Sequence, residues 1–396
     1  MPLAADTMVG VVGAGSMGSG IAQVAAVHGH RVMLSDADAA SLDRAKASIG
    51  QALDRQVEKG KLTAADARDA KGRITYVAGV GETQWASFAG CGLVIEAVLE
   101  ELTLKKAVFT ALDRVLPADA VLATNTSSLS VAAIGAACKH PGRVVGIHFF
   151  NPAPVMPLVE IVGAITTDAG VVSAARAFVD GWGKTTVVAS DTPGFIVNRI
   201  ARPFYGEALR IAEEGIADYA TIDWAMRDIG GFKMGPFELM DFIGNDVNYA
   251  VTCSVFEAMY YDPRYRPALT QRRLVEAGLL GRKAHRGYYD YREGARTPSP
   301  MRDHGLGKRV VDRIVAMLIN EAVDALHMRV ADAADIELAM TKGVNYPKGL
   351  LAWGDELGVR AVLQRITALQ EEYGEDRYRP SPQLRRLAKE ARRILA

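Results

Sequence analysis

A histidine and a glutamate in neighbouring apolar segments form a pair that could do acid–base chemistry. His148 ends the run Val144–His148, and Glu160 lies inside the run Leu158–Val162. A carboxylate among apolar residues is costly to bury unless it is paired, and the Asn-Pro-Ala-Pro turn between the runs can bring them together. The carboxylate would fix the imidazole tautomer and stabilise the imidazolium, as a general base requires. Taken alone, a histidine at this place is more often structural.

Two more polar elements could complete such a site. The segment Asn125-Thr126-Ser127-Ser128 follows the apolar run Val121–Ala123, and loops after the strands of an open α/β sheet are where ligands bind. Asn198 stands at the start of a later helical region and could face the same cleft. Each residue also has a purely structural interpretation, because Ser127 could cap a helix and Asn198 could cap one or bridge two domains.

The elements that position these residues begin with a glycine loop. An apolar strand, Met8–Val12, leads into Gly13-Ala14-Gly15-Ser16-Met17-Gly18 and then into a helical pattern. In this order Gly13 permits a tight turn, Gly15 lets the backbone approach a pyrophosphate, and Gly18 lets helix and strand pack closely. The helix N-terminus adds free N–H groups and a positive dipole end. The segment therefore predicts a dinucleotide-binding loop.

An acidic residue after the next strand selects the dinucleotide. Asp36 ends the strand Arg31–Ser35 and lies 18 residues beyond Gly18, close to the spacing of the acid that binds the adenosine ribose. Its charge would repel the 2′-phosphate of NADP, and the next residue, Ala37, is not an arginine that could accept that phosphate. We therefore expect NAD; the alternative is a tight turn with a surface aspartate.

The bulk composition excludes several classes of protein. The chain has 396 residues, enough for two or three domains, and is 49% hydrophobic and 23% charged. Lys and Arg together number 46, as do Asp and Glu, so nucleic acid is not expected as a partner. Its 3 cysteines form no metal pattern and argue against a disulfide framework. No run suits a signal peptide or a membrane helix, so we expect a cytoplasmic protein with no membrane contact.

The chain divides by its periodicity into four parts. Alternating strands and helices predict a mostly parallel α/β domain over residues 1–189, with a charged helical excursion at Ser41–Ala70. Helical patterns then predict a second domain over residues 190–291, and a Pro-, Gly- and charge-rich stretch at residues 292–307 predicts a linker. Residues 308–396 form the fourth part. The expected strands are Val9–Val12, Val32–Leu34, Leu93–Glu96, Val121–Thr124, Val144–His148, Leu158–Ile161 and Thr185–Val188.

The fourth part repeats the second. Glu207-Ala208-Leu209 recurs as Glu321-Ala322-Val323, 114 residues later, and further Gly, Asp and Met positions keep the same offset. Generic helical composition does not explain one fixed offset across such different residue types. We therefore expect a duplicated helical domain.

Together these segments resemble the L-3-hydroxyacyl-CoA dehydrogenase family, and most closely its bacterial branch of 3-hydroxybutyryl-CoA and 3-hydroxyadipyl-CoA dehydrogenases. The resemblance implies a Rossmann-type NAD-binding domain followed by two all-α domains like the C-terminal domain of 6-phosphogluconate dehydrogenase. It also implies interconversion of (3S)-3-hydroxyacyl-CoA and 3-oxoacyl-CoA with NAD, in fatty-acid or aromatic-acid degradation. The motifs that carry it are Gly13–Gly18, Glu96–Lys105, Asn125–Ser128, His148–Pro152, Pro193–Arg199, Met234–Leu239 and Gly281–Lys283.

The resemblance also implies a role for single residues. His148 would be the general base, Glu160 its partner, and Ser127 and Asn198 would hold the substrate oxygens. Lys59, on the helical excursion, would meet the CoA phosphates. The residues implied at the cofactor are Gly13, Gly15, Ser16, Met17, Gly18, Asp36, Glu100, Lys105, Ser127, Asn151 and Lys283.

The sequence departs from the family pattern at three places. Pro157 stands where many relatives have a lysine. The second helical copy has Asp312 where the first has Asn198, and it ends before any counterpart of Gly281–Lys283, so it is expected to be non-catalytic. We expect residues 308–396 to pack on the first copy in place of a partner subunit, giving a monomer with an internal pseudo-dimer; a homodimer is the alternative.

Other functions stay open at this point. A dehydrogenase of a free hydroxy acid or polyol would share the cofactor domain, and an NAD-binding protein with a decayed site would share the fold. The length of the acyl chain, the presence of a terminal carboxylate on it and the direction of the reaction are not fixed by the sequence.

Overall fold

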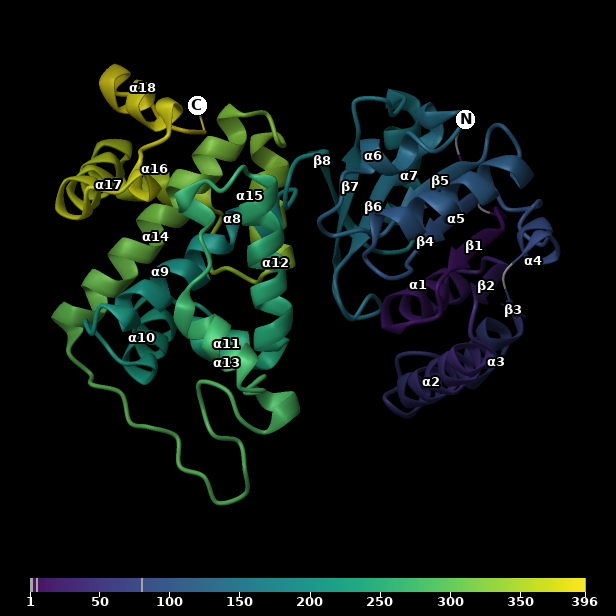
Figure 1. Cartoon of the computed structure of the whole chain (residues 1–396), viewed down its shortest axis with the longest axis horizontal. Coiled ribbons are helices and arrows are strands. Elements are labelled where there is room, and N and C mark those ends of the chain that lie inside the picture. Colours follow the sequence, from purple (N-terminus) through teal and green to yellow (C-terminus); the bar gives the residue numbers. More distant parts are fainter. Residues whose placement is uncertain (1–2, 5, 80, 396) are drawn as a thin grey trace. The chain divides into compact units, whose positions relative to one another are not determined.

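The computed structural model describes residues 3–4, 6–79 and 81–395 and divides the chain into two compact units, Met1–Phe195 and Ile196–Ala396. The first unit is a sheet with covering helices and the second is helical (Figure 1). The division falls a few residues after the border that the sequence predicts, because the chain runs on from the last strand through Thr192-Pro193-Gly194 before the first helix of the second unit begins.

An eight-stranded sheet forms the centre of the first unit. Its strands are β1 (Val9–Val12), β2 (Val32–Asp36), β3 (Ile74–Ala78), β4 (Leu93–Glu96), β5 (Val121–Thr124), β6 (Val144–Phe149), β7 (Leu158–Gly163) and β8 (Thr185–Ser190). They lie in the order β3-β2-β1-β4-β5-β6-β7-β8. All neighbours pair in parallel except β6 and β7, which are antiparallel. The mostly parallel sheet that the sequence predicts is confirmed.

One strand was not predicted. β3 lies at the edge of the sheet, where only Ile74 of its five residues is buried. Its sequence, Ile-Thr-Tyr-Val-Ala, lacks the continuous apolar run that marked the buried strands, because an edge strand is not enclosed on every side.

Helices cover the sheet. Residues of β1, β2, α1 and α7 share a buried core that includes Val11, Leu34, Ile21 and Phe178. The helical excursion is a pair, α2 and α3, joined by a short turn. The helices of this unit are α1 (Ser16–Val27), α2 (Ala39–Glu58), α3 (Ala64–Gly72), α4 (Glu82–Ala86), α5 (Leu102–Val115), α6 (Val131–Gly135), the short η1 (Pro141–Arg143) and α7 (Ala169–Asp180).

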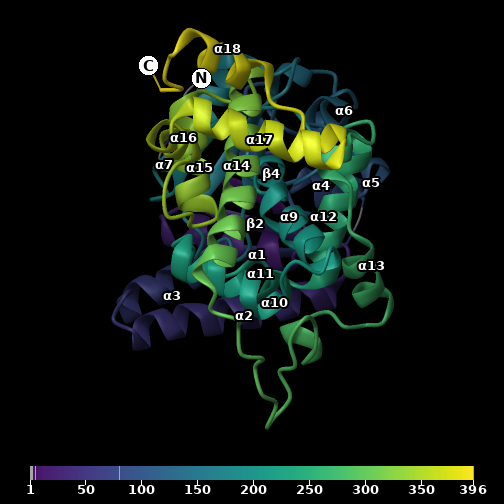
Figure 2. The same cartoon turned by 90° about the vertical axis from the view of Figure 1, so that its left-hand side faces the viewer.

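The second unit is built around one long helix, α14 (His304–His327), which is buried on nearly all sides from Val310 to Val323. A helix that is buried all round lies at the centre of a packed body. Helices α9, α16, α17 and α18 contact it, and Figure 2 shows α17 crossing it. The other elements are α8 (Val197–Ile200), α9 (Arg202–Glu213), α10 (Tyr219–Trp224), the π-helical turn η2 (Ala225–Ile229), α11 (Pro236–Ile243), α12 (Asn245–Ala258), η3 (Pro263–Tyr265), α13 (Leu269–Glu276), η4 (Arg282–Ala284), α15 (Ala333–Gly343), α16 (Leu350–Leu357), α17 (Val359–Tyr373), η5 (Asp376–Tyr378) and α18 (Pro382–Glu390).

The two helical stretches exchange matching contacts. Arg199 Nε lies 2.7 Å from Glu321 Oε1, and Arg313 Nε lies 2.9 Å from Glu207 Oε2. Arg313 stands 114 residues after Arg199, and Glu321 stands 114 residues after Glu207, so each copy gives its arginine to the glutamate of the other. Such reciprocity is the signature of a two-fold interface. The repeated stretches therefore form one body, and α14 begins inside the segment expected to be a linker.

Candidate active site

The register of β6 and β7 places the histidine and the glutamate side by side. The two strands are antiparallel, and His148 is directly opposite Glu160, so their side chains share one face of the sheet. His148 Nδ1 lies 2.7 Å from Glu160 Oε2. Glu160 is fully buried and His148 is 5% exposed. The pairing that the sequence suggested is present, and Nε2 is the ring nitrogen left to exchange a proton with a ligand.

Two aromatic rings surround the imidazole. The ring centroid of Phe150 lies 4.6 Å from that of His148, and the centroid of Phe195 lies 5.8 Å from it. Phe195 has a φ of 47°, in the left-handed region that bulky side chains rarely adopt. These rings limit the imidazole to one orientation, as a group that must receive a proton along a fixed direction requires.

The carboxylate of Glu100 accepts hydrogen bonds from the loop that follows β5. Glu100 Oε1 accepts hydrogen bonds from the N–H of Ser127 at 2.9 Å and from the hydroxyl of Thr126 at 2.6 Å. Burial disfavours the charged form of Glu100, but the neighbouring Lys105 and these hydrogen bonds outweigh it and lower the pKa of Glu100. Asn125 Oδ1 accepts the N–H of Phe149 at 2.8 Å. The loop that carries Ser127 is thus tied to the strand that carries His148.

Lys105 lies beneath this loop and is only 1% exposed. Its Nζ lies 2.6 Å from Glu96 Oε1 and 3.2 Å from Glu100 Oε2. Burial raises the pKa of Glu96 even though Lys105 is beside it. Lys105 therefore fixes the two glutamates, and through Glu100 it fixes the loop with Ser127, instead of lining a cavity as a direct ligand would.

The glycine loop has the geometry that close approach requires. Gly13 has a φ of 101°, and a Cβ atom on Gly18 would stand 1.8 Å from the carbonyl oxygen of Gly13. A Cβ on Gly15 would meet nothing within 4 Å, so the backbone at Gly15 faces open space that a ligand can fill. Asp36 accepts the N–H of Ala14 at 2.7 Å through Oδ2, which holds the loop against the end of β2.

A cavity of about 760 Å³ adjoins this loop. One side consists of the loop residues Gly13, Gly15, Ser16 and Met17 with Asp36, and the other side is apolar, with Trp85, Val98, Leu104 and Val108. Phosphate-binding backbone beside a ribose-binding acid and an apolar slot fits the adenosine half of a dinucleotide. Sequence reasoning missed the apolar wall, because Trp85 belongs to α4, a five-residue helix with no motif of its own.

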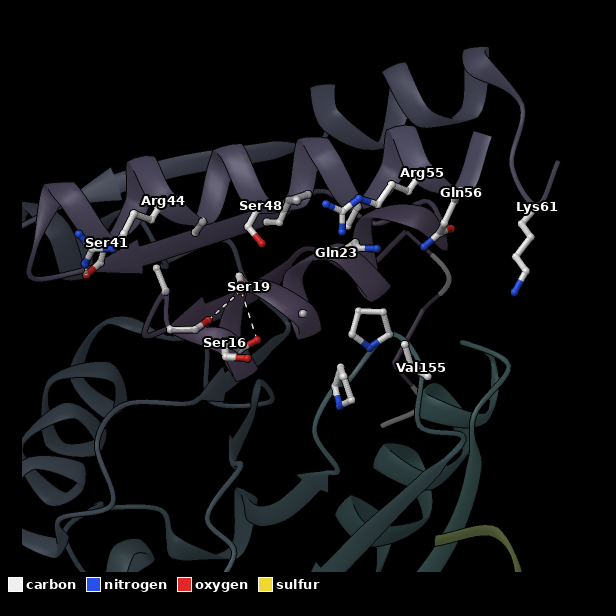
Figure 3. A pocket seen from close by; sticks show the side chains of 18 of the residues that line it. Ser16, Ser19, Gln23, Ser41, Arg44, Ser48, Arg55, Gln56, Lys61 and Val155 are labelled. Carbon is white, nitrogen blue, oxygen red and sulfur yellow. Dashed lines mark hydrogen bonds between the residues drawn. The ribbon is translucent and has the colours of Figure 1, made fainter. Parts of the chain in front are cut away.

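A second cavity of about 770 Å³ lies between α1 and α2. Figure 3 shows Ser48 and Arg55 of α2 and Gln23 of α1 pointing into the space between the two helices. Lys59 is one of its lining residues, as are the bases Arg44 and Lys61, which the sequence analysis did not single out. The positive charges along α2 could have indicated a binding site for an anion, but a charged helix face usually only contacts solvent.

The loop between β6 and β7 closes one side of this second cavity. Pro152, Pro154 and Val155 line it, and Asn151 Oδ1 accepts a long hydrogen bond, 3.5 Å, from Ser16 of the glycine loop. Lys184 Nζ donates to the carbonyl oxygen of Met156 at 2.8 Å. Burial lowers the pKa of Lys184. Lys184 thus holds the loop that connects the strands of His148 and Glu160, a role that no sequence motif indicated.

Two predicted site residues belong to the helical unit. Asn198 is half-buried on α8. Lys283 lies in η4, and its Nζ is 2.6 Å from Asp246 Oδ1. Their roles in a site with His148 stay predictions.

Other features of the described residues bear on the class of protein. Across these residues, no group of three or more His, Cys, Asp or Glu side chains is arranged to hold a metal ion. Nor does any helix among them combine the length and the apolar character that crossing a membrane demands.

The glycine loop, the acid at the end of β2 and the buried His–Glu pair define an NAD-binding oxidoreductase. Residues 8–192 match the family model described as 3-hydroxyacyl-CoA dehydrogenase, NAD binding domain. The model of the C-terminal domain of the same family matches twice, at residues 194–291 and 310–393. The chain belongs to the 3-hydroxyacyl-CoA dehydrogenase family, and the helical duplication that the sequence predicts is confirmed.

Individual relatives agree with this assignment. The chain is 41% identical to the 3-hydroxyadipyl-CoA dehydrogenase of Escherichia coli (strain K12), over 96% of this chain and 97% of the relative. It is 42% identical to the 3-hydroxybutyryl-CoA dehydrogenase of Bradyrhizobium diazoefficiens, over 74% of this chain and 97% of the relative. A crystal structure titled 3-hydroxybutyryl-CoA dehydrogenase from Escherichia coli K12 superposes with a TM-score of 0.91 at 39% identity, covering 97% and 98% of the two chains.

Proposed function

We propose that this chain interconverts (3S)-3-hydroxyacyl-CoA and 3-oxoacyl-CoA with NAD, with His148 as general base and acid. The observation that carries the proposal is the buried pair of His148 Nδ1 and Glu160 Oε2, 2.7 Å apart, on strands next to the loop of Ser127. Family membership supports the reaction class, and the geometry supports the residues.

In the oxidation, His148 Nε2 takes the proton of the 3-hydroxyl group. The electron pair of that O–H bond forms the C=O bond at C3, and the hydride leaves C3. The bound cofactor supplies the hydride acceptor at its nicotinamide ring. Glu160 stabilises the imidazolium that forms, and Ser127 holds the reacting oxygen; the family resemblance implies the same role for Asn198. In reduction His148 returns the proton.

The cofactor fits the residues around the glycine loop. The backbone from Gly13 to Gly18, with Ser16 and Met17, receives the pyrophosphate, and Asp36 receives the adenosine ribose hydroxyls. Glu100 and Lys105 keep the Ser127 loop in place beside it. Asn151, bonded to Ser16, completes the part of the cofactor site that the first unit supplies.

The second cavity suits the phosphates of CoA. Arg44, Arg55, Lys59 and Lys61 give it a row of positive charges, and its wall includes the loop that follows His148. A phosphorylated carrier bound there would present its thioester towards the catalytic pair. The named relatives act on hydroxybutyryl and hydroxyadipyl thioesters, so a short or medium acyl group is proposed.

The first test is NADH oxidation with acetoacetyl-CoA, 3-oxoadipyl-CoA and free acetoacetate. Turnover of the thioesters alone supports the proposal, and the ratio of the two thioesters identifies the acyl end. Turnover of free acetoacetate at the same kcat/KM would contradict it.

Replacing the base gives the largest loss of activity. We expect His148→Gln to fold and to lose about 10²–10⁴ in kcat, the usual contribution of a general base, while NADH binding stays unchanged. His140→Gln, at a largely exposed histidine, is the matched control and should keep wild-type kcat. Wild-type turnover by His148→Gln would refute the assignment.

The helical unit supports an internal pseudo-dimer in a monomeric chain. The reciprocal pairs Arg199–Glu321 and Arg313–Glu207 form within one chain, where a two-subunit enzyme would form them between subunits. The cysteines Cys91, Cys138 and Cys253 are all free, which suits the reducing cytoplasm that we propose as its compartment.

Light scattering on the whole chain and on a chain cut after Tyr291 tests this pseudo-dimer. The cut chain should dimerise or aggregate, because truncation uncovers the apolar face against which α14 packs. A cut chain as soluble and monomeric as the whole would contradict the proposal.

A further inference from the structure

A third cavity, of about 450 Å³, lies inside the helical unit, away from the motifs that the proposed reaction uses. Three arginines line it, Arg210, Arg266 and Arg377, together with Glu213 and the short apolar segment of residues 267–269. Arg210 is 7% exposed and Arg377 is 4% exposed. Buried guanidinium groups that face one space repel each other unless an anion lies between them.

The internal repeat explains how this cluster arises. Arg377 stands where the other copy has Arg264, 113 residues earlier, and Arg210 stands where the other copy has Asp324, 114 residues later. Arg264 Nη1 lies 3.1 Å from Asp324 Oδ2. Arg377 therefore has Arg210 at the position where Arg264 has Asp324, so a positive charge replaces the acid.

In the first copy, the acid stands one helical turn after the position that matches Asp324, at Glu214. Glu214 accepts hydrogen bonds from Arg313 at 2.8 and 3.0 Å, but it lies 3.6 Å from Arg377 Nη2. Glu375 is 3.4 Å from Arg377 Nε. Among the described residues, the buried Nε atoms of Arg377 and of Arg264 both have no hydrogen-bond partner. The difference lies in the distances to the acids: Arg264 Nη1 donates to Glu321 at 3.0 Å and to Asp324 at 3.1 Å, whereas Arg377 approaches its acids only to 3.4 and 3.6 Å.

Other acids near the cavity also have partners, and Glu375 Oε2 lies 3.7 Å from Arg266 Nη2 as well as close to Arg377. Glu207 Oε2 accepts from Arg313 at 2.9 Å, and its Oε1 lies 3.2 Å from Arg210. Glu213 Oε1 accepts the N–H of Thr270 at 2.9 Å. Burial lowers the pKa of Arg210; the Glu207 carboxylate opposes this shift, and the positive charges of Arg377 and Arg266 add to it. The residues that line the cavity itself therefore carry three positive charges and one negative charge, that of Glu213.

We propose that the cavity lined by Arg210, Arg266 and Arg377 binds a phosphate group. Guanidinium forks match phosphate oxygens in pairs, and three of them suit a dianion better than a single carboxylate. The cavity is larger than a phosphate alone, and Pro267, Ala268 and Leu269 give it an apolar side. The ligand is a phosphate, free or as an ester of a small apolar group.

Calorimetric titration of the whole enzyme tests this site. The protein is first saturated with NADH and CoA, which fill the phosphate-binding places of the first unit, and is then titrated with inorganic phosphate and with phenyl phosphate. Tighter binding of phenyl phosphate identifies an ester as the ligand, and equal or tighter binding of inorganic phosphate identifies the free ion.

Two variants remove the site in different ways. Arg266→Ala deletes an exposed arginine and should weaken phosphate binding about tenfold, the effect of one charged hydrogen bond. Arg210→Asp restores the arrangement of the other copy, so that an internal carboxylate pairs with Arg377; it should abolish phosphate binding and leave NADH oxidation unchanged.

Arg272→Ala is the control, because Arg272 is exposed on the adjacent α13 and pairs with Glu276. It should bind phosphate as the wild type does. No binding by the saturated wild type up to millimolar phosphate, or wild-type affinity in Arg266→Ala, would overturn the proposal. The result does not depend on acyl-CoA turnover, so it stands or falls separately from the proposed reaction.

Discussion

The two helical copies have kept the same packing groups but not the same chemical groups. Asp223 accepts two N–H groups at the start of α11, both at 2.9 Å, and Glu337 accepts the matching pair at the start of α16, at 2.7 and 3.1 Å. Asn198 of the first copy, by contrast, has Asp312 as its counterpart. Positions that match in both copies are those that the fold requires, and positions that differ are those that the proposed reaction requires. Single substitutions at matching positions can measure the effect of each on stability and on activity.

The largest effect is expected where the two copies hold each other. Glu321→Gln leaves the guanidinium groups of Arg199 and Arg264 without their buried carboxylate, and should lower the free energy of unfolding by about 3–5 kcal/mol. Glu207→Gln should cost a similar amount, since Arg313 loses its buried carboxylate and keeps only Glu214, as Arg199 keeps only Asp324 when Glu321 is replaced. Denaturant unfolding measures both. A large loss at one position and none at the other would break the pseudo-two-fold comparison.

The next effect concerns activity. Asn198→Ala should lower kcat/KM about 10²-fold, about 2.7 kcal/mol, if Asn198 makes the hydrogen bond to the reacting oxygen that the family resemblance implies. Asp312→Ala, at the matching position, should stay near wild type, since Asp312 forms a half-exposed pair with Lys308. Steady-state kinetics with the best thioester compares them. Equal losses would mean that the second copy takes part in catalysis.

The smallest effect, counted per pH unit, is a slope of the free energy of unfolding against pH. Burial raises the pKa of Asp223 from 3.8 to about 7, so the folded protein keeps a proton there that the unfolded chain loses. Stability should therefore fall as pH rises from about 4 to 7, by at most about 1.4 kcal/mol per pH unit from this group. Asp223→Asn should flatten the slope, measured by urea unfolding at several pH values.

Glu337→Gln is the matched control for that slope. Burial also raises the pKa of Glu337, but Glu337 is only half-buried, so removing its charge should flatten the slope less than Asp223→Asn does. An equal or larger change from Glu337→Gln would contradict the expectation that depth of burial sets the difference.

The buried strands and the His–Glu pair could be predicted because short-range patterns encode them. Buried parallel strands are continuous apolar runs, and β3 was missed because an edge strand has no such run. The pairing of His148 with Glu160 followed from a turn between two short strands.

Contacts made over long distances in the chain were not predictable in the same way. Lys105 carries no mark in the sequence of being buried under Glu96, since a lysine on an amphipathic helix usually faces water. The offset of 114 residues announced a repeat, but it did not say that each arginine would pair with the glutamate of the other copy. The cavity of Arg210 and Arg377 also joins segments far apart in sequence, so no local motif indicated it.

Joining both copies in one polypeptide also changes what mutation can do. In a homodimer one codon specifies both sides of a two-fold interface, so an arginine on one side is an arginine on the other. Here two codons specify the matching positions, and one encodes Arg210 while the other encodes Asp324. An asymmetric interface is therefore available to this chain by ordinary point mutation, whereas a self-associating subunit can never reach it.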